Sequence, residues 1–198
     1  MNKQLQRNRI LILGIFAMSI IPVIIAWVLF LNPDWLGDKI NLGKLIIPPV
    51  PTERNDLLGI DTFSKANMKE LPGHWIMINL IPKQECAENC QEAIHKTKQL
   101  RLMLNKELVR TRRLVILLTN VDSDVFKKIW SADGRLLRAR PSQNLLDKLL
   151  EIRKGVVPDG MLLIMDPLGN LMMQYDPGFD PYDVKKDLKK LLKISQIG

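Results

Sequence analysis

Cys86 and Cys90 are the only two cysteines in this chain of 198 residues, and they are four positions apart. If both lie in the first turn of a helix, the helical rise places their Cα atoms about 6 Å apart, within the range of about 4.4 to 6.8 Å that a disulfide tolerates. A helix N-terminus also favours the thiolate, which is the nucleophile in thiol–disulfide exchange and a ligand for soft metals. We expect Lys83 to favour the thiolate further, whereas Glu85 and Glu88 oppose it.

Three interpretations of this cysteine pair remain open. A purely structural disulfide suits an exported protein, but a loop this short removes little entropy from the unfolded chain. A redox-active pair would exchange disulfides with a partner. A dithiol site for Cu(I) would normally need a third ligand, a His or a Met.

The chain around the cysteines alternates between apolar runs and helical patterns. The helix over residues 142–154 begins at the N-cap Ser142 and stops at Gly155. Together the patterns predict an α/β protein of order β-α-β-α-β-β-α, which is the order of the thioredoxin fold. The predicted elements are strand 75–81, helix 87–108, strand 113–119, loop 120–124, short helix 125–130, helix 142–154, strands 161–165 and 171–175 joined by a hairpin loop, and helix 181–194.

An N-terminal segment, residues 10–31, carries no charge over 22 positions. At about 1.5 Å of rise per residue it can cross a hydrocarbon core of about 30 Å. A cleaved signal peptide is the alternative, but its apolar region is normally about 7 to 15 residues and ends at small residues, whereas this one is longer and runs into Phe30, Leu31 and Asn32. We therefore predict an anchor that stays attached.

The charges on either side of this anchor predict its orientation. Lys3, Arg7 and Arg9 precede the anchor, and Asp34 and Asp38 follow it. By the positive-inside rule, the N-terminus then lies in the cytoplasm and the rest of the chain in the periplasm of a bacterium, at the inner membrane.

Four segments follow from these boundaries. Residues 1–9 are a cytoplasmic N-terminus, 10–31 the transmembrane anchor, 32–55 an extended tether containing several prolines, and 56–198 the thioredoxin-like domain. The net charge is +8. Because an exported domain meets no nucleic acid, we expect this charge to form a solvated basic face or to attract anionic lipid or an acidic protein.

Three segments of the domain carry a resemblance to a known family. They are Cys86–Cys90 (CAENC) following a strand that ends in Ile81-Pro82, Val115–Asp122 (VILLTNVD) and Leu163–Asn170 (LIMDPLGN). The region of roughly residues 56–195 resembles the SCO/SenC/PrrC family of membrane-anchored, thioredoxin-like proteins that assist copper insertion into cytochrome c oxidase. The resemblance implies copper as a cofactor at Cys86 and Cys90, and a respiratory oxidase subunit or another assembly factor as partner.

The chain departs from that family at the loop before strand 161–165. The family has a third copper ligand there, a His, but this chain reads Val157-Pro158-Asp159-Gly160. We therefore expect Cu(I) binding of the family type to be weak or lost. Val157-Pro158 instead resembles the cis-proline site that lies beside the cysteines in thioredoxins, and an ordinary trans proline is the alternative.

Other chemically capable residues are expected to have plain structural roles. His95 faces away from the cysteine pair, His74 precedes the first strand, and the methionines on alternating strand positions fill the core rather than bind copper. Asp122 and Asp124 are expected to serve a loop turn. The methionines concerned are Met161, Met165, Met172 and Met173.

Taken together, these patterns favour a factor in respiratory oxidase assembly that acts on the thiols or the copper of a partner through Cys86 and Cys90. A general periplasmic thiol-disulfide oxidoreductase is the first alternative, and a scaffold with a merely structural disulfide is the second.

Overall fold

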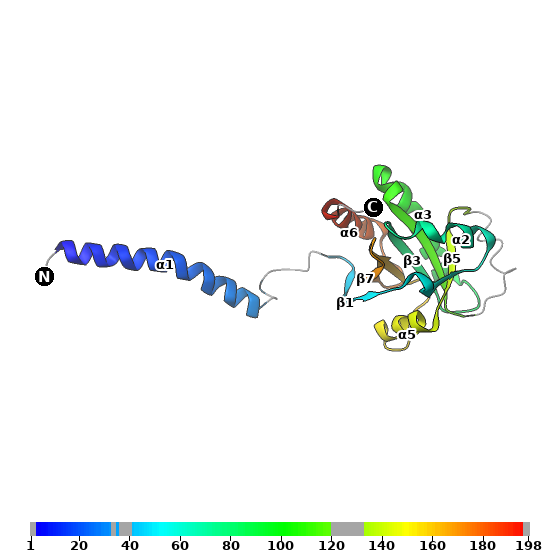
Figure 1. Cartoon of the computed structure of the whole chain (residues 1–198), viewed down its shortest axis with the longest axis horizontal. Helices are drawn as coiled ribbons and strands as arrows, with labels where there is room; N and C mark the ends of the chain where they lie inside the picture. The colour runs from blue at the N-terminus through cyan, green and yellow to red at the C-terminus, as the bar shows by residue number, and fades with distance from the viewer. Residues whose placement is uncertain (1–2, 33–34, 36–40, 120–132, 196–198) are drawn as a thin grey trace. The chain divides into compact units, whose positions relative to one another are not determined.

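A computed structural model describes residues 3–32, 35, 41–119 and 133–195 of the chain (Figure 1). It divides into two compact units, residues 1–40 and 41–198. The first unit contains the single helix α1 (Lys3–Leu31), in which residues Gln6–Leu31 are long and apolar enough to cross a membrane. Such a helix is consistent with a membrane anchor or a signal sequence.

The second unit is built on a seven-stranded sheet of order β1-β7-β6-β3-β4-β5-β2. The central strands β3 and β4 are parallel, and β6 lies antiparallel on the other side of β3. The strands are β1 (Lys44–Pro51), β2 (Leu57–Gly59), β3 (Trp75–Ile81), β4 (Thr111–Leu117), β5 (Leu137–Pro141), β6 (Leu162–Met165) and β7 (Asn170–Tyr175).

Helices cover both faces of this sheet, which explains why every residue of β3 is buried (Figure 1). On one face α3 (Glu88–Met103) and α6 (Pro181–Ile194) pack over Trp75 and Met77. On the other face α5 (Gln143–Ile152) packs Leu145 and Leu149 over Ile76 and Ile78. The α/β thioredoxin-like fold with a long apolar N-terminal helix is thus confirmed.

The prediction of an extended tether over residues 32–55 is wrong for its second half. Residues 44–51 form β1, which pairs antiparallel with β7 at the sheet edge, and Ile46 is buried in the core. Prolines are tolerated at an edge strand because one side of its backbone needs no partner. The backbone N–H groups of Leu42 and Gly43 also donate to the carboxylate of Asp187 on α6. The domain therefore begins near residue 41.

Several predicted elements coincide with those observed, among them β3 and α6 at the same residues. The expected helix 87–108 is divided at Leu104 into α3 and the 3-10 helix η4 (Asn105–Arg110). The Ser142 hydroxyl caps α5 by accepting from the Leu145 N–H. The structure adds β2, β5, α2 (Thr62–Asn67) and the 3-10 helices η2 (Arg54–Asp56) and η3 (Met68–Glu70). The expected loop 120–124, with Asp122 and Asp124, and the expected helix 125–130 lie outside the described residues.

Candidate functional site

Cys86 and Cys90 form a disulfide where β3 passes into α3, with their Cα atoms 5.2 Å apart. Cys90 lies in the first turn of α3, whereas Cys86 precedes the N-cap residue Ala87. The separation is close to the expected 6 Å even though Cys86 lies just outside the helix. The pair can thus form and break its bond without a large change in the backbone.

The disulfide is packed into a small apolar cluster at this end of the sheet. Cys86 is 6% exposed and Cys90 2% exposed. The surrounding side chains come from β3, β4 and α3 and from the residue before β5, namely Ile81, Ile94, Val115, Leu117 and Leu136. Cys86 is therefore the less buried residue of the pair and the more accessible to a reagent from solvent.

The start of α3 favours a thiolate at this position. Ala87, the N-cap residue, has no side-chain oxygen that could accept from the N–H groups of the first turn. The partial positive charge of the helix N-terminus therefore acts on the adjacent cysteines. Gln91 holds the turn before the helix by donating its Nε2 to the carbonyl oxygen of Cys86 at 2.9 Å. Lys83, Glu85 and Glu88 are exposed, so solvent weakens their influence.

The loop before β6 lies against the first turn of α3. Gly160 has a φ of +86°, and a β-carbon at this position would lie 2.7 Å from the carbonyl oxygen of Asn89, between the two cysteines. Only glycine allows the two backbones to approach this closely.

Asp159, next to that glycine, is a titratable group in the loop before β6. Its Oδ1 is buried and has no hydrogen-bond partner among the described residues. Burial raises the pKa of this carboxyl, while Lys83 and the Gly160 N–H oppose the rise. The sequence offers one signal for this carboxyl, an Asp between a proline and a glycine just before a buried strand. The burial of its Oδ1, however, follows only from the packing of the loop.

The Val157–Pro158 peptide bond is trans, so the cis-proline interpretation of Pro158 is wrong. The cis bond among the described residues is Ile47–Pro48, in the edge strand β1. Val157 is buried in the core below β6, and Pro158 is partly exposed beside it.

Residues 75–195 match the model of a family described as "Transmembrane-like, thioredoxin-like, C-terminal domain". The chain belongs to this thioredoxin-like family. No curated protein sequence matches this family member.

Solved structures share the fold of this thioredoxin-like protein at low sequence identity. Apo Sco1 from Thermus thermophilus is 13% identical, with a TM-score of 0.54 over 76% of this chain and 96% of that one. Yeast Sco1 with copper bound is 16% identical, with a TM-score of 0.52 over 80% and 96%. BsSco, a member of the Sco family of cytochrome c oxidase assembly proteins, is 17% identical, with a TM-score of 0.50 over 80% and 99%. These likenesses show the fold.

A copper ion at the cysteine pair of this thioredoxin-like domain would find only two soft ligands in the cluster around it. In the ranges covered by the structure, no three His, Cys, Asp or Glu side chains form a metal-binding group. His95 is exposed on α3, and the Nδ1 of His74 lies 3.3 Å from the carbonyl oxygen of Pro72, before β3. The donor set thus fits a two-coordinate dithiolate, without the third soft ligand that Cu(I) would normally take.

The methionines do not supply that third ligand. Met161 and Met165 are buried in the core cluster under α5, and Met173 is buried in the cluster under α3 and α6. Met172 packs against the latter cluster. Their thioethers therefore fill the core on two faces of the sheet, as expected from their alternation.

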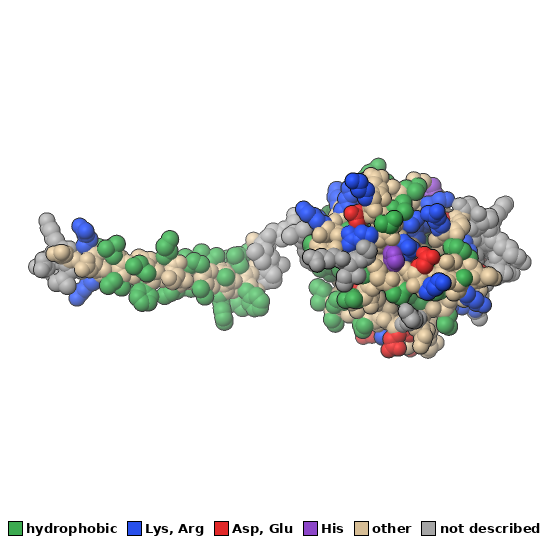
Figure 2. All heavy atoms as spheres, turned by 45° about the horizontal axis from the view of Figure 1, so that its top comes forward, with side chains coloured by type: hydrophobic (Ala, Val, Ile, Leu, Met, Phe, Trp, Pro, Cys, Tyr) green, Lys and Arg blue, Asp and Glu red, His purple; other side chains and the backbone are tan. Residues whose placement is uncertain are grey.

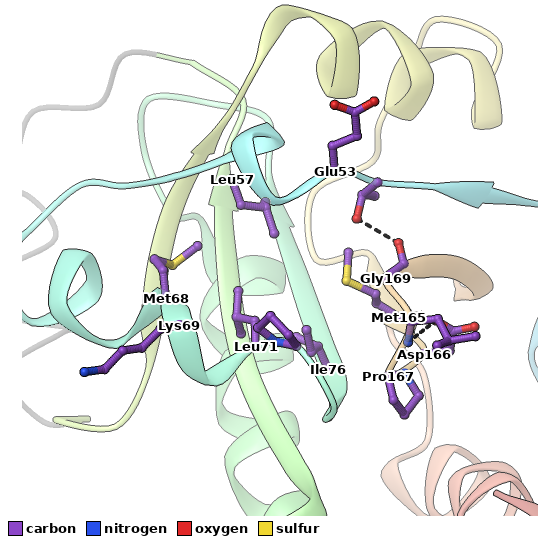
Figure 3. Close-up of a pocket in the computed structure, with 13 residues that line it drawn as sticks. Glu53, Leu57, Met68, Lys69, Leu71, Ile76, Met165, Asp166, Pro167 and Gly169 are labelled. Carbon is purple, nitrogen blue, oxygen red and sulfur yellow. Dashed lines mark hydrogen bonds between the residues drawn. The ribbon is translucent and has the colours of Figure 1, made fainter. Parts of the chain in front are cut away.

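The apolar hollow drawn in Figure 3 is a separate feature, at the far end of β3 from the disulfide. It has a volume of about 420 Å³ and is lined chiefly by Leu57, Met68, Leu71, Ile76 and Met165. The charged ends of Glu53 and Lys69 point away from it (Figure 3). Since Ile76 and Ile81 are five strand residues apart, about 16 Å separates the hollow from the end of β3 that leads to the cysteines.

Proposed function

We propose that this protein is a membrane-anchored, thioredoxin-like factor in the assembly of a respiratory cytochrome c oxidase, and that it acts on the thiols of a partner through Cys86 and Cys90. The observation that carries the proposal is the bonding of the only two cysteines at the N-terminus of α3. A respiratory partner is suggested by the shared fold with Sco proteins.

The reaction is thiol–disulfide exchange and involves two electrons. In the reduced protein the Cys86 thiolate attacks a disulfide of the partner, forms a mixed disulfide and releases one partner thiolate. The Cys90 thiolate then attacks the Cys86 sulfur, which releases the second partner thiolate and restores the Cys86–Cys90 disulfide. The partner gains the two electrons and takes up two protons from water. The reverse sequence oxidises a partner dithiol.

Copper is a secondary element of this proposal. Two thiolates can hold Cu(I), but no third soft ligand lies near the pair in the part of the chain that the structure describes, which favours electron exchange over copper storage. A dithiol that keeps the thiols of a partner reduced would serve assembly without carrying the metal itself. A dithiol without a third copper ligand is equally compatible with the alternative, a general periplasmic thiol-disulfide oxidoreductase. The identity of the partner therefore decides between oxidase assembly and general disulfide exchange.

The placement of the domain is also part of the proposal. We infer that α1 is retained as an inner-membrane anchor with its N-terminus in the cytoplasm and the domain in the periplasm, because Lys3, Arg7 and Arg9 precede the apolar segment. An alkaline phosphatase fusion at Gly198 should be active in a bacterial host. An inactive but well-expressed fusion would reverse the orientation.

A deletion strain tests the proposed function. It is complemented with the natural protein, with Cys86→Ser, with Cys90→Ser, or with the control Ser195→Ala, which leaves the cysteines intact. We expect the cysteine variants to lose assembled oxidase activity, while other periplasmic disulfide proteins keep their redox state in an acid-trapped thiol assay. Loss of both readouts would favour the general oxidoreductase. If oxidase activity is kept in both cysteine variants, the disulfide is structural.

A further inference from the structure

Two adjoining hollows lie beside α3, away from the disulfide. They have volumes of about 390 and 340 Å³ and share the lining residues Arg101, Leu108, Arg113 and Arg135. The shared residues come from α3, η4, β4 and the loop before β5, so four separate segments of the chain meet there. Arg101 is eleven residues beyond Cys90 on the helical path, which corresponds to about 16 Å.

The lining is strongly basic. Five basic side chains line the hollows, and two described carboxylates accompany them, Asp133 and Glu70. The basic residues are Lys98, Arg101, Arg112, Arg113 and Arg135. Lys and Arg side chains are likewise more prominent than Asp and Glu on the visible face of the domain (Figure 2).

Both carboxylates already have arginine partners. Arg113, only 4% exposed, forms a buried ion pair with Asp133 and also donates to the carbonyl oxygen of Ile94 at 2.9 Å. Arg112 pairs with Glu70 at 3.1 Å. These two arginines are therefore compensated, and their side chains are held in place.

Neither Arg101 nor Arg135 forms an ion pair with a carboxylate among the described residues. Arg101 donates only to the carbonyl oxygens of Leu108 and Thr111, each at 3.3 Å, and no described carboxylate pairs with it. Arg135 is exposed and also lacks a carboxylate partner among the described residues. Burial lowers the pKa of Arg101 and repulsion from the neighbouring arginines lowers it further, while attraction to Asp133 opposes the fall. A simple solvated basic face would not place a partly buried guanidinium among three others.

We infer that the two hollows form one binding site for a phosphate-type oxyanion, held by the guanidinium groups of Arg101 and Arg135 with Arg112 beside them. Guanidinium groups offer planar pairs of N–H donors that match the oxygens of a phosphate, and a bound anion relieves the repulsion among the arginines. Phe63, Leu108 and Val109 line the hollow of about 390 Å³, so a group attached to the phosphate would meet an apolar wall. The ligand is either free phosphate or the phosphate of a lipid headgroup.

The test uses the full chain in non-ionic detergent micelles at low ionic strength. Isothermal titration calorimetry measures binding of inorganic phosphate in one arm and of dihexanoyl phosphatidylglycerol, below its micellar concentration, in the other. We expect saturable one-to-one binding of at least one probe with a dissociation constant below about 1 mM. Losing one charge-assisted contact should weaken this binding about 10-fold or more in Arg101→Ala and in Arg135→Ala.

Arg140→Ala is the matched control, because Arg140 is also exposed but lines neither hollow. It should change the affinity less than twofold. Because Arg135 is exposed, its variant tests the site even if Arg101→Ala fails to fold. Arginine-dependent binding of phosphate identifies a free oxyanion as the ligand, and arginine-dependent binding of the lipid alone identifies a headgroup. Absence of binding by both probes, or equal weakening in the control, overturns the inference.

Discussion

The contact between Gly160 and the first turn of α3 gives a quantitative prediction. In Gly160→Ala the new β-carbon would lie 2.7 Å from the carbonyl oxygen of Asn89, closer than real β-carbons approach a neighbour. The positive φ adds about 1 to 2 kcal/mol for a residue other than glycine, and overpacking of this kind adds about 1 to 3 kcal/mol. We therefore expect the free energy of unfolding to fall by about 2 to 5 kcal/mol.

Gly155→Ala is a matched control for the backbone contribution. Gly155 has a φ of +89°, but a β-carbon there meets nothing within 4 Å, so only the conformational part, about 1 to 2 kcal/mol, should be lost. The difference between the two variants isolates the contact beside the cysteines.

Urea unfolding of residues 41–198 in the oxidised state, followed by circular dichroism, measures both losses. The rate at which dithiothreitol reduces the disulfide should also change in Gly160→Ala, because the displaced Asn89 lies between the two cysteines, and should stay the same in Gly155→Ala. Equal destabilisation by the two substitutions would refute this account of the loop.

Three further predictions concern the cysteines and a partly exposed carboxylate, Asp61. Reduction of the Cys86–Cys90 disulfide should lower the free energy of unfolding by about 2 kcal/mol, because a five-residue ring restricts the unfolded chain only modestly. Urea midpoints with and without a phosphine reductant measure this loss, and an equally stable reduced form would contradict the prediction. Cu(I) binding by the reduced domain, titrated against a calibrated chelator, should be much weaker than in a His-containing relative and should vanish in Cys86→Ser or Cys90→Ser. Tight binding that survives these changes would reveal other ligands. Burial raises the pKa of Asp61, but hydrogen bonds from the Ser64 N–H and from Arg138 outweigh it and lower the pKa overall. The stability that this carboxylate contributes is therefore present above its unfolded pKa of about 3.9 and is lost as the pH falls through the lower folded value. Between pH 5 and pH 3, the free energy of unfolding of Asp61→Asn should therefore fall less than that of the natural protein.

Local patterns in the sequence were sufficient for the central elements and for the cysteine pair. The uncharged run of residues 10–31 predicts the long apolar helix, and the apolar run of residues 75–81 predicts β3. Cys86 and Cys90 fall where that strand meets a helical pattern, so helical geometry predicted their proximity, and the prediction holds although Cys86 lies one residue before the N-cap Ala87. These features depend on neighbours within a few turns of chain, which is the range over which hydrophobic periodicity carries information.

The edge of the sheet could not be predicted in this way. The prolines of residues 44–51 suggested a tether, but the segment is held as β1 by pairing with β7 and by Asp187, which accepts from N–H groups more than 140 residues earlier in the chain. The segment shows no clear periodicity because most side chains of β1 are exposed and only Ile46 is buried. Its pairing is therefore decided by distant partners.

The surroundings of the disulfide and the basic site likewise came only from the tertiary structure. The sequence shows a glycine at 160 and arginines at 101, 113 and 135, but not that the glycine touches Asn89 or that the arginines line the same hollows. It also leaves the isomer of the Val157–Pro158 bond open, since both isomers are compatible with a loop. Each of these outcomes depends on how segments far apart in the chain pack together, because burial and repulsion are properties of the assembled surface rather than of any one segment.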